Sequence, residues 1–597
     1  MVIRRWFFLL FVVCVFSIFL ARLFFLQIIR GDFYYRKSEN NRIQLIKNIA
    51  PRGRIYDCKG ELLVDNRPSF CAYLVPWLAR NKIDEAVEHF ERIYKIDVQE
   101  IKRRVKRQRF RPFQPIPLAQ DLPPVVVSRI LESGNEFPGI IIETIPSRCY
   151  PNHSLCAHLL GYVQEISEKD LREKLKDEGY EYGDQIGQVG IERFCEPFLK
   201  GIDGGTKIEI DVRGRPAHPP RILGEREPII GADVLLTIDK KIQEACEFAL
   251  LGKRGAIVVT DPFNGDILGM ASSPDFDPNM FTHPIPSRKW QKIVNSPGHP
   301  MLNRTVQATY PPGSVFKIVV AVAALEEGKI DPQEVFNCEG VHRAGTRVYR
   351  CWNRTGHGLV NFTRGVAESC DIYFYHLGVR LGPEIIEKYA RLFGLGVRSG
   401  IDIPGERSGV VPGPDWKKKV KKERWFLGDT FNFSIGQGYL LATPLQMANV
   451  VNVIFNGGKL YKPRLIQEIL FRGADTTMLH RGGKKFVPQL ISEINLNPAT
   501  VNLMKMALRL VVTKGTGTLA NILEAEVMGK TGTAQNPGGE DHAWFVCFAQ
   551  PNMSIPHAVD SRATPVTIVV FVENGGSGST VASPIAAQVL RSIFYGP

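Results

Sequence analysis

The chain has 597 residues, too many for one hydrophobic core, so its length predicts two or three domains. Its hydrophobic content of 44% and charged content of 23% are ordinary for a globular protein. The net charge of +14 draws on two basic runs, Lys102–Arg109 and Lys417–Lys422; such runs are typical of solvated faces, and we expect no nucleic-acid partner.

The N-terminal run Trp6–Ile29 is long and apolar enough to cross a membrane. It has about 24 residues, against the roughly 20 that a helix needs to span the hydrocarbon core. Arg4 and Arg5 precede it, so the positive-inside rule makes residues 1–5 a cytoplasmic tail and places everything after the run outside the cytoplasm. A cleaved signal peptide is the alternative, but no clear cleavage site follows. We expect an uncleaved single-pass anchor over residues 6–29.

Residues 30–225 mix short strand-like runs with proline-rich turns and charged helical stretches. Gly139–Glu143 is one of the strand-like runs, and Arg213–Pro220 has the composition of a boundary linker. No internal repeat is evident. The pattern predicts a mixed, β-containing domain over residues 30–225 and a second domain over residues 226–597.

The second domain has the pattern of an antiparallel sheet with helices. Its strand-like apolar runs are Ala256–Thr260, Asp266–Met270, Ala543–Ala549 and Pro565–Val572. Asn264 and Gly265 lie between the first two runs, which is a strong hairpin signal. Val581–Phe594 is predicted to be a C-terminal helix that packs on the sheet.

Ser314 and Lys317 begin an apolar helical run. The turn Tyr310–Gly313 precedes it, and Val315–Leu325 is apolar around most of its circumference, which predicts a buried helix. Ser314 would lie at the helix N-terminus, where free N–H groups and the helix dipole favour negative charge on a substrate. Lys317 would share its face. Burial and a second cation, such as Lys530, would lower the pKa of Lys317 and free it to accept a proton.

Two later triplets, Ser369-Cys-Asp371 and Lys530-Thr-Gly532, supply further groups for acyl transfer. The first offers a second hydroxyl, and the second offers a cation for a carboxylate. Because Lys530-Thr-Gly532 precedes a strand-like run, we expect it on an edge strand with Thr531 and Thr533 beside the substrate. The backbone N–H groups of Ser314 and Thr533 would form an oxyanion hole. Each motif alone is a weak signal, but their conjunction in this order predicts an acyl-transfer enzyme.

Ser-x-x-Lys, a Ser-Asp-Asn-type triplet and Lys-Thr-Gly together form the signature set of penicillin-binding proteins and class A β-lactamases. Over nearly its whole length the chain resembles the class B penicillin-binding proteins, the peptidoglycan D,D-transpeptidases. Further stretches similar to that family are Ala50–Asp57, His158–Ser167, Gly190–Arg193 and Ser434–Gly438. Asp371 stands where many relatives carry Asn, and this variant indicates the elongation-specific branch.

The resemblance implies an α+β fold: a penicillin-binding/β-lactamase-like transpeptidase domain, an antiparallel sheet flanked by helices, behind the anchor and a pedestal domain of the dimerisation type. It implies a Ser314 acyl-enzyme that β-lactams would block, with Ser369 in a proton relay between Lys317 and Lys530. The implied catalytic residues are Ser314, Lys317, Ser369, Asp371 and Lys530, and the substrate-binding residues are Thr531, Gly532 and Thr533.

The resemblance also implies the setting of the enzyme. The catalytic domain would lie in the bacterial periplasm and bind peptidoglycan stem peptides and β-lactam antibiotics. Membrane-embedded glycan polymerase and scaffold proteins of the elongation complex would be its partners. A D,D-carboxypeptidase, a β-lactamase and a non-catalytic scaffold of the elongation complex are the alternatives that remain open.

Eleven cysteines are many for an extracytoplasmic protein, where thiols tend to oxidise. Three thiolates and one imidazole make a sound tetrahedral ligand set for structural zinc, and this chain offers them as Cys338, Cys351, His357 and Cys370. Acyl transfer itself would not require the zinc ion. Their spacing is not Cys-x-x-Cys, and a Cys338–Cys351 disulfide or simply buried thiols are the alternatives. The resemblance favours zinc, since some elongation-type relatives hold it here with carboxylates that Cys338 and Cys351 would replace.

Overall fold

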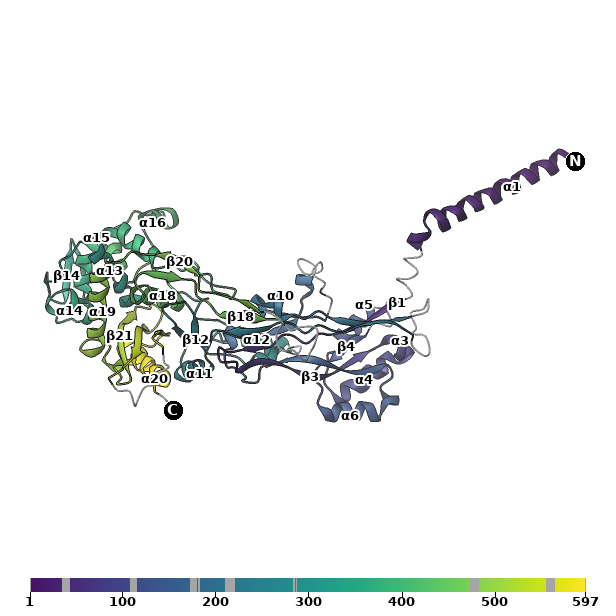
Figure 1. The fold of residues 1–597 in the computed structure, drawn as a ribbon, viewed down its shortest axis with the longest axis horizontal. Coiled ribbons are helices and arrows are strands. Elements are labelled where there is room, and N and C mark those ends of the chain that lie inside the picture. Colours follow the sequence, from purple (N-terminus) through teal and green to yellow (C-terminus); the bar gives the residue numbers. More distant parts are fainter. Residues whose placement is uncertain are drawn as a thin grey trace. The chain divides into compact units, whose positions relative to one another are not determined.

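The computed structural model describes residues 2–34, 43–107, 115–171, 180, 183–209, 221–282, 285, 287–471, 483–554 and 564–595. The chain, which Figure 1 shows coloured from its N-terminus to its C-terminus, divides into two compact units. Unit 1 contains Met1–Arg52, Asn66–Ser147 and Lys200–Gly231, and unit 2 contains Gly53–Asp65, Arg148–Leu199 and Ala232–Pro597. The predicted linker Arg213–Pro220 lies outside the described residues, and the domain boundary at residue 226 stays a prediction.

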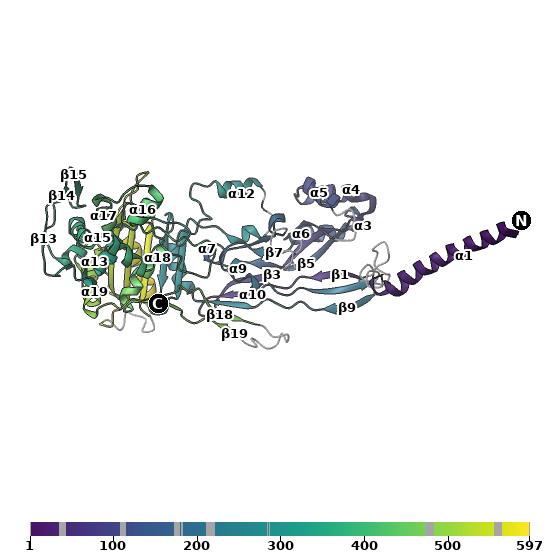
Figure 2. The same ribbon diagram turned by 90° about the horizontal axis from the view of Figure 1, so that it is seen from above.

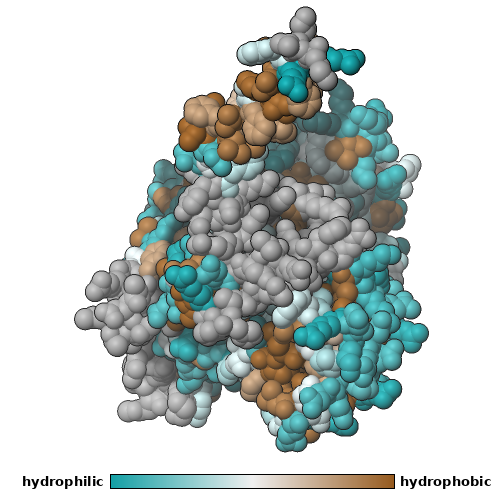
Figure 3. All heavy atoms as spheres, turned by 90° about the vertical axis from the view of Figure 1, so that its right-hand side faces the viewer, coloured by the Kyte–Doolittle hydropathy of each residue, from teal (hydrophilic) through white to brown (hydrophobic). Residues whose placement is uncertain are grey.

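The N-terminal run forms the helix that its composition predicts. Helix α1 (Val2–Phe24) continues into the π-helical turn η1 (Phe25–Ile29), and Arg4–Ile29 is long and apolar enough to cross a membrane. Its large side chains are exposed, with Trp6 at 69%, and they form the brown surface at the top of Figure 3. Such a surface is unfavourable in water. The helix therefore fits a single-pass membrane anchor.

Unit 1 is built on antiparallel strands with helices against them. One sheet has the order β1 (Ile43–Asn48), β8 (Gly204–Glu209), β9 (Ile222–Arg226). Strand β3 (Leu62–Leu74) pairs through Ala72–Leu74 with β4 (Ile116–Ala119), and it also pairs with β5 (Ile140–Cys149). The core contains residues of β3 and β4 and of α4 (Ile83–Ile93), α5 (Val98–Arg107) and α6 (Pro124–Glu132). The strand predicted at Gly139–Glu143 is confirmed as β5, and Lys102 and Arg103 of the first basic run face solvent.

In unit 2, short strands join segments that are far apart in the sequence. Strand β2 (Ile55–Tyr56) pairs with the start of β3 and with β10 (Asp233–Leu236), which pairs with β18 (Ile466–Leu470). A buried ion pair of 2.6 Å joins Arg148 to Glu192 in the same unit. The strand pairings attach residues 53–65 to the larger body that contains residues 232–597, and the Cys156 N–H, which donates to Glu247 Oε1 at 2.8 Å, attaches the segment 148–199 to the same body.

The larger body of unit 2 contains a five-stranded antiparallel sheet. Its order is β12 (Ile267–Ser273), β11 (Gly255–Thr260), β23 (Val566–Val572), β22 (His542–Pro551), β21 (Ala525–Ala534). The hairpin predicted around Asn264-Gly265 joins β11 to β12. Strand β21 lies at the edge of the sheet, as predicted for the strand that carries Lys530. The α+β fold expected from the sequence is confirmed.

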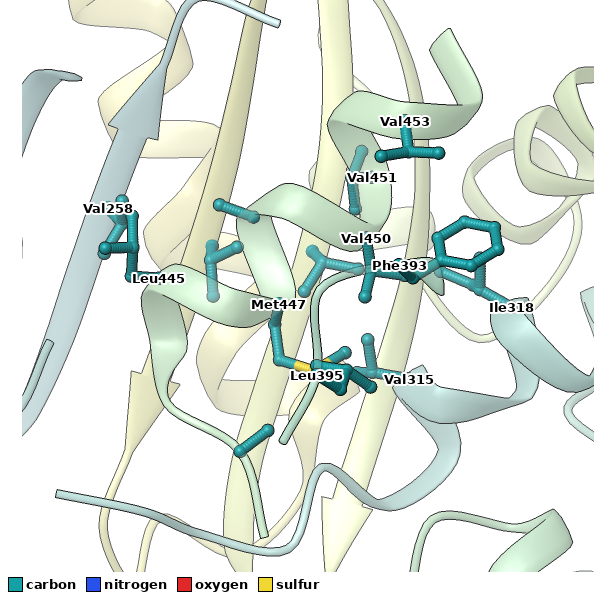
Figure 4. Close-up of a cluster of buried hydrophobic side chains, with 14 of the residues drawn as sticks. Val258, Val315, Ile318, Phe393, Leu395, Leu445, Met447, Val450, Val451 and Val453 are labelled. Carbon is teal, nitrogen blue, oxygen red and sulfur yellow. The ribbon is translucent and has the colours of Figure 1, made fainter. Parts of the chain in front are cut away.

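Alternating side chains of the sheet face two different helical layers, because successive residues of a strand point to opposite faces. Val258, Val546 and Val569 pack with α13 (Lys317–Glu326) and α18 (Pro444–Phe455). Ile257, Cys547 and Ile568 pack with α11 (Lys240–Ala249) and α20 (Ser583–Phe594). Figure 2 shows the sheet with its helices from above, and in Figure 4 Leu445 and Met447 lie between Val258 and Val315. The sheet is therefore covered on both faces.

The helix after Ser314 is buried on every side, as its uniformly apolar composition predicts. All residues from Lys317 to Ala324 are buried. Each buried valine or isoleucine contributes about 1.5–3 kcal/mol relative to an exposed one, so this segment is firmly held. The predicted C-terminal helix is also present, although α20 begins at Ser583, with Pro584 in its first turn where proline is favoured.

Candidate active site

Ser314 lies on a tight turn at the start of the buried helix. It belongs to the 3-10 turn η7 (Gly313–Phe316), which leads directly into α13. Gly313 has a φ of +56°, a conformation that favours glycine, and its N–H donates to the carbonyl of Gly436 at 2.9 Å. Ser314 is half-buried and lines a cleft of about 1030 Å³. Its predicted place at the helix N-terminus is confirmed, with a 3-10 first turn.

The first and second motifs meet at the buried ammonium group of Lys317. Its Nζ donates to the carbonyl of Ser369 at 2.8 Å, to Ser369 Oγ at 3.3 Å and to Asp371 Oδ1 at 2.7 Å. The lysine side chain is fully buried and that of Asp371 is 11% exposed. A charge at such depth is tolerated only when it is paired and hydrogen-bonded. Asp371 therefore serves as the counter-ion of Lys317.

Ser369 is held in a strained backbone conformation. Its φ is +55°, in the left-handed region that residues other than glycine rarely adopt. Cys370 follows as the N-cap residue of α15 (Asp371–Leu392). Strained residues persist where the surrounding contacts determine them, and they cluster at functional sites. Here the strain directs Ser369 toward Lys317, and the side chain is buried.

Lys530 brings a second buried amine to the same place. It lies on the edge strand β21, and its Nζ donates to the Thr531 carbonyl at 3.3 Å. Burial and the nearby charge of Lys317 lower the pKa of Lys530 well below its ordinary value. The neutral form of Lys530 is therefore more accessible than that of a surface lysine. The electrostatic effect of Lys317 on Lys530 agrees with the expectation that the two amines are neighbours.

The glycine of the third motif lets strand β21 approach the Ser314 turn. A Cβ atom on Gly532 would lie 2.7 Å from Val315 Cγ2 and 3.0 Å from the Pro312 carbonyl oxygen, so a larger residue would push the two segments apart. A Cβ on Gly313 would lie 2.7 Å from the carbonyl oxygen of Thr533. The backbones of the first and third motifs are thus in contact. This is the arrangement that an oxyanion hole built from both segments requires.

The four predicted metal ligands come together behind the second motif. The Sγ atoms of Cys338, Cys351 and Cys370 and a ring nitrogen of His357 all lie within 4.8 Å of one another. His357 Nδ1 is 3.5 Å from the Sγ atoms of both Cys338 and Cys351. In a tetrahedral zinc site of ordinary bond lengths, ligand atoms are about 3.6–3.8 Å apart. The three cysteines are buried and unpaired, so the group fits a closed metal site.

The electrostatics of this cluster favour a thiolate. The Cys370 thiol and His357 both hydrogen-bond to Cys351 and lower the pKa of its thiol. The same Cys351 sulfur raises the pKa of His357 to about 9. Among the residues with described side chains, His357 Nε2 is one of the few buried polar atoms without a hydrogen-bond partner. A bound divalent cation would neutralise the negative charge that the thiolates of this cluster carry.

Sequence reasoning missed several residues that line the cleft. Thr516 Oγ1 lies 2.5 Å from Thr531 Oγ1, and the backbone N–H of Trp352 donates to Asp371 Oδ2 at 2.8 Å. Tyr349 and Arg350 enter the cleft from the hairpin of β14 (Val341–Ala344) and β15 (Arg347–Arg350). For Thr516, the run Lys514-Gly-Thr-Gly517 is a signal that the sequence offers. For Trp352 the sequence offers none, because its contribution is a backbone N–H that any residue could supply.

One basic run departs from the expected solvated face. Lys417 in α16 (Pro414–Lys421) is buried, with a side chain 3% exposed, and pairs with Asp429 at 2.7 Å. Its Nζ also lies 4.8 Å from the ring centre of Phe426. The expectation of a solvated face is therefore wrong for Lys417, because the helix turns this one lysine toward the core. Lys418, Lys419 and Lys421 are exposed.

Comparison with known families assigns both halves of the chain. The penicillin binding protein transpeptidase domain matches residues 255–591, and the penicillin-binding protein dimerisation domain matches residues 47–236. The first match contains all three motifs of the site, together with the four cluster residues. The second match covers most of the region predicted to be a pedestal.

Individual relatives agree with the family matches. The peptidoglycan D,D-transpeptidase MrdA of Acinetobacter baumannii is 33% identical over 586 residues, covering 96% of this chain and 84% of that protein. The penicillin-binding protein PBP2 of Helicobacter pylori, solved in complex with MreC, has a TM-score of 0.76 at 27% identity and covers 92% of this chain and 98% of its own.

A third relative, a chain from a structure of a peptidoglycan synthase complex that coordinates polymerization and crosslinking, has a TM-score of 0.71 at 28% identity. It covers 99% of this chain and 98% of its own. The family matches, the relatives and the meeting of the three motifs at one site agree. The chain belongs to the penicillin-binding protein transpeptidases, in the group that contains MrdA and PBP2.

Proposed function

We propose that this chain is a serine-type D,D-transpeptidase that cross-links peptidoglycan stem peptides during cell-wall elongation. The observation that carries the proposal is the convergence of three distant motifs: Lys317 donates to Ser369 and Asp371, while Lys530 approaches from the edge strand. Ser314 lines the cleft beside them. A hydroxyl, a proton relay and a buried cation are the groups that acyl transfer needs.

The reaction then has two halves. Ser314 Oγ attacks the carbonyl carbon of the penultimate D-Ala, and the C–N bond to the terminal D-Ala breaks. The proton of Ser314 passes through Lys317, Ser369 and Lys530 to the departing amine. An amine of a neighbouring stem next attacks the ester carbon, the C–O bond to Ser314 breaks, and a proton of that amine returns to the serine oxygen.

The third motif binds the charge of the donor in the first half, and the oxyanion is stabilised in both halves. Lys530, Thr531 and Thr533 bind the terminal carboxylate of the donor stem. The N–H groups of Ser314 and Thr533 donate to the oxyanion, a role in which one lost donor costs roughly 10²–10³ in rate. A β-lactam that resembles the D-Ala-D-Ala terminus would form the same ester and remain there.

The lifetime of the acyl-enzyme tests this function against its alternatives. We expect the purified full chain to hold a fluorescent penicillin covalently for many minutes, and to form cross-linked dimers from pentapeptide-bearing glycan strands. Release of the penicillin within seconds would identify a β-lactamase. Release of D-Ala without any dimer would identify a carboxypeptidase, and failure to bind penicillin would identify a scaffold.

The partners and the location follow from relatives and from the anchor. The Helicobacter relative was solved with MreC, and another relative belongs to a peptidoglycan synthase complex. We infer that this chain likewise acts with a membrane glycan polymerase and scaffold proteins of the elongation complex. Arg4 and Arg5 before the apolar run support a cytoplasmic N-terminus and a periplasmic catalytic domain.

We also propose that Cys338, Cys351, His357 and Cys370 hold one structural zinc ion. Four protein ligands leave no open position, so the bound ion would stabilise the fold and supply no chemistry to the substrate. Cys351 precedes Trp352, whose N–H holds Asp371, and Cys370 precedes Asp371 itself. The cluster thereby fixes the counter-ion of Lys317 from two sides.

Removing one ligand should therefore loosen the fold and the site together. We expect Cys370→Ser to lose zinc, to unfold at a lower temperature and to react more slowly with penicillin, because Ser369 and Asp371 flank the altered residue. Elemental analysis of protein purified without chelator measures the metal directly. Cys547→Ser, at a buried thiol in β22 far from the cluster in sequence, is the control and should keep the metal. Wild-type protein without zinc, with Cys338 and Cys351 joined as a disulfide, would refute the site.

A further inference from the structure

Unit 2 contains a second cavity, separate from the Ser314 cleft. Its volume is about 610 Å³, within the range of roughly 300–1,000 Å³ that is typical of small-molecule sites. All of its lining residues belong to unit 2, and none of them lines the Ser314 cleft. Among the described residues that line it, none is Asp, Glu, Lys or Arg. The cavity is therefore mostly apolar, and the proposed transpeptidase reaction does not use it.

Aromatic rings form and support the walls of this cavity. His158 and Phe276 line it and meet edge to face, with ring centres 5.2 Å apart. Tyr162, which also lines it, stacks on Phe281 at 3.9 Å, and Phe281 meets the ring of Trp290 edge to face at 6.1 Å. Such ring pairs hold one another in orientation, and their free faces and edges accept a further ring. The walls therefore favour a planar aromatic ligand.

Helix α12 (Ser287–Val294) forms one side of the cavity with an apolar face. Trp290, Ile293 and Val294 line the cavity, and their spacing of three and four residues places them on the same face of the helix. Trp290 is nevertheless 38% exposed and Val294 is 48% exposed. Apolar surface that is open to water is unfavourable, so a ligand that covers these side chains would be stabilised by their burial.

His158 brings a free hydrogen-bond acceptor to the cavity. The side chain is buried, and its Nε2 donates to the carbonyl oxygen of Pro300 at 2.7 Å, because a carbonyl can only accept. Burial and the nearby charge of Arg304 lower the pKa of His158 to about 4, so the ring is neutral near pH 7. The proton on Nε2 then leaves Nδ1 as an acceptor.

Two polar atoms of the lining are open to a ligand. Among the described residues, neither His158 Nδ1 nor the hydroxyl of Tyr162 has a hydrogen-bond partner, although the two residues are only 8% and 6% exposed. Neither atom belongs to the fully buried polar atoms without a partner, so both are reached from the cavity that their residues line. A few such polar groups in an apolar pocket are what orients a bound small molecule.

We propose that this cavity binds a neutral aromatic small molecule that carries an O–H or N–H group for His158 Nδ1. The ring of the ligand packs against the aromatic walls, and its donor pairs the free imidazole nitrogen. The Tyr162 hydroxyl donates to or accepts from a second polar group. A charged ligand is disfavoured, because it would lose its hydration among lining residues that offer no counter-ion. Because the cavity is separate from the Ser314 cleft, this binding does not depend on the proposed transpeptidase function.

Two probes of nearly equal shape test the donor. β-Naphthol is neutral near pH 7 and carries a hydroxyl, whereas its methyl ether cannot donate. Equilibrium dialysis of the full chain in lipid nanodiscs, with protein-free nanodiscs to subtract uptake by the lipid, measures both dissociation constants. We expect one β-naphthol per chain, bound about fivefold more tightly than the ether, because the ether leaves the His158 acceptor unpaired.

Variants locate the binding. Val294→Trp adds a large side chain at a position that lines the cavity, so it should weaken β-naphthol binding by about tenfold or more. Lys292→Trp adds the same side chain on the opposite face of α12, at an exposed position that does not line the cavity, and should bind as the wild type. His158→Phe keeps a ring but removes Nδ1, so the two probes should bind within about twofold of each other.

The comparison of the two probes on the wild type needs no variant. Thermal unfolding followed by circular dichroism shows which variants fold, and if His158→Phe does not, Val294→Trp and Lys292→Trp still locate the site. Absence of binding by the wild type, equal binding of both probes, or wild-type binding by folded Val294→Trp would overturn the inference. Penicillin labelling of the same wild-type sample tests the transpeptidase function separately.

Discussion

Replacing Ser314 with alanine should abolish covalent labelling by a fluorescent penicillin. The acyl-enzyme is an ester of this one oxygen, so no slower route to the same adduct remains when the oxygen is absent. Ser314 is half-buried on a turn whose backbone is fixed by Gly313 and Gly436, and its truncation to alanine leaves those contacts intact. We expect the unfolding temperature to stay near that of the wild type. Gel fluorescence measures the label and circular dichroism the fold.

The other active-site serine provides the control. Ser369→Ala removes an acceptor of Lys317 Nζ but keeps the nucleophile, so labelling should become slower while its final extent is retained. Labelling that persists in Ser314→Ala would contradict the assignment. Labelling that disappears only in Ser369→Ala would exchange the two roles.

Asp371→Ala should destabilise the protein more than any single surface change. The substitution leaves the ammonium of Lys317 buried without its counter-ion, and breaking a buried ion pair in this way costs about 3–5 kcal/mol. The loss includes the 2.8 Å bond from the Trp352 N–H. Urea denaturation of the full chain in detergent, followed by the fluorescence of its tryptophans, measures the free energy of unfolding.

A second variant separates charge from hydrogen bonding. Asp371→Asn keeps an oxygen that can accept from Lys317 Nζ, so we expect a loss well below that of Asp371→Ala. If the two variants lose equal stability, charge pairing dominates. If Asp371→Ala unfolds at wild-type urea concentrations, the carboxylate is not the counter-ion that the 2.7 Å contact indicates.

The parts of the fold that the sequence predicts well are those with one dominant cause. Val315–Leu325 is apolar on all sides, and only a buried central position satisfies such a helix. Asn264-Gly265 between two apolar runs permits a tight hairpin. Lys530-Thr-Gly532 falls on the edge strand because it precedes an apolar strand-like run. In each case local chemistry and tertiary environment demand the same structure.

Other features depend on contacts that no local pattern encodes. The packing of helix α16 buries Lys417 against Asp429. A run of lysines in the sequence gives no reason to single out this one as buried. The segment Tyr349–Arg354, which lines the cleft, gives no signal in the sequence because its key donor is the backbone N–H of Trp352. The compact units also combine segments that are distant in the chain, such as residues 53–65 with the catalytic body.

The cysteine cluster lies between these two cases. Residue types predict it, since three thiols and an imidazole suit zinc, but the spacing from Cys338 to Cys370 resembles no familiar motif. The four ligands come together because Cys338 ends strand β13 (Phe336–Cys338) and because Cys370 follows the strained turn at Ser369 before α15. The same turn directs Ser369 to one side and Cys370 to the other. A shared backbone feature thus links the proposed metal site to the proton relay.

The central claim is that Ser314 carries the acyl group of a stem peptide. Peptide mapping by mass spectrometry tests it most directly: the wild-type chain is mixed with a pentapeptide donor, quenched in acid and digested. We predict that the fragment containing Ser314 gains the mass of the pentapeptide minus D-Ala, and that one D-Ala is released for each adduct. An adduct on the fragment containing Ser369, or release of D-Ala with no adduct on any serine, would contradict the claim.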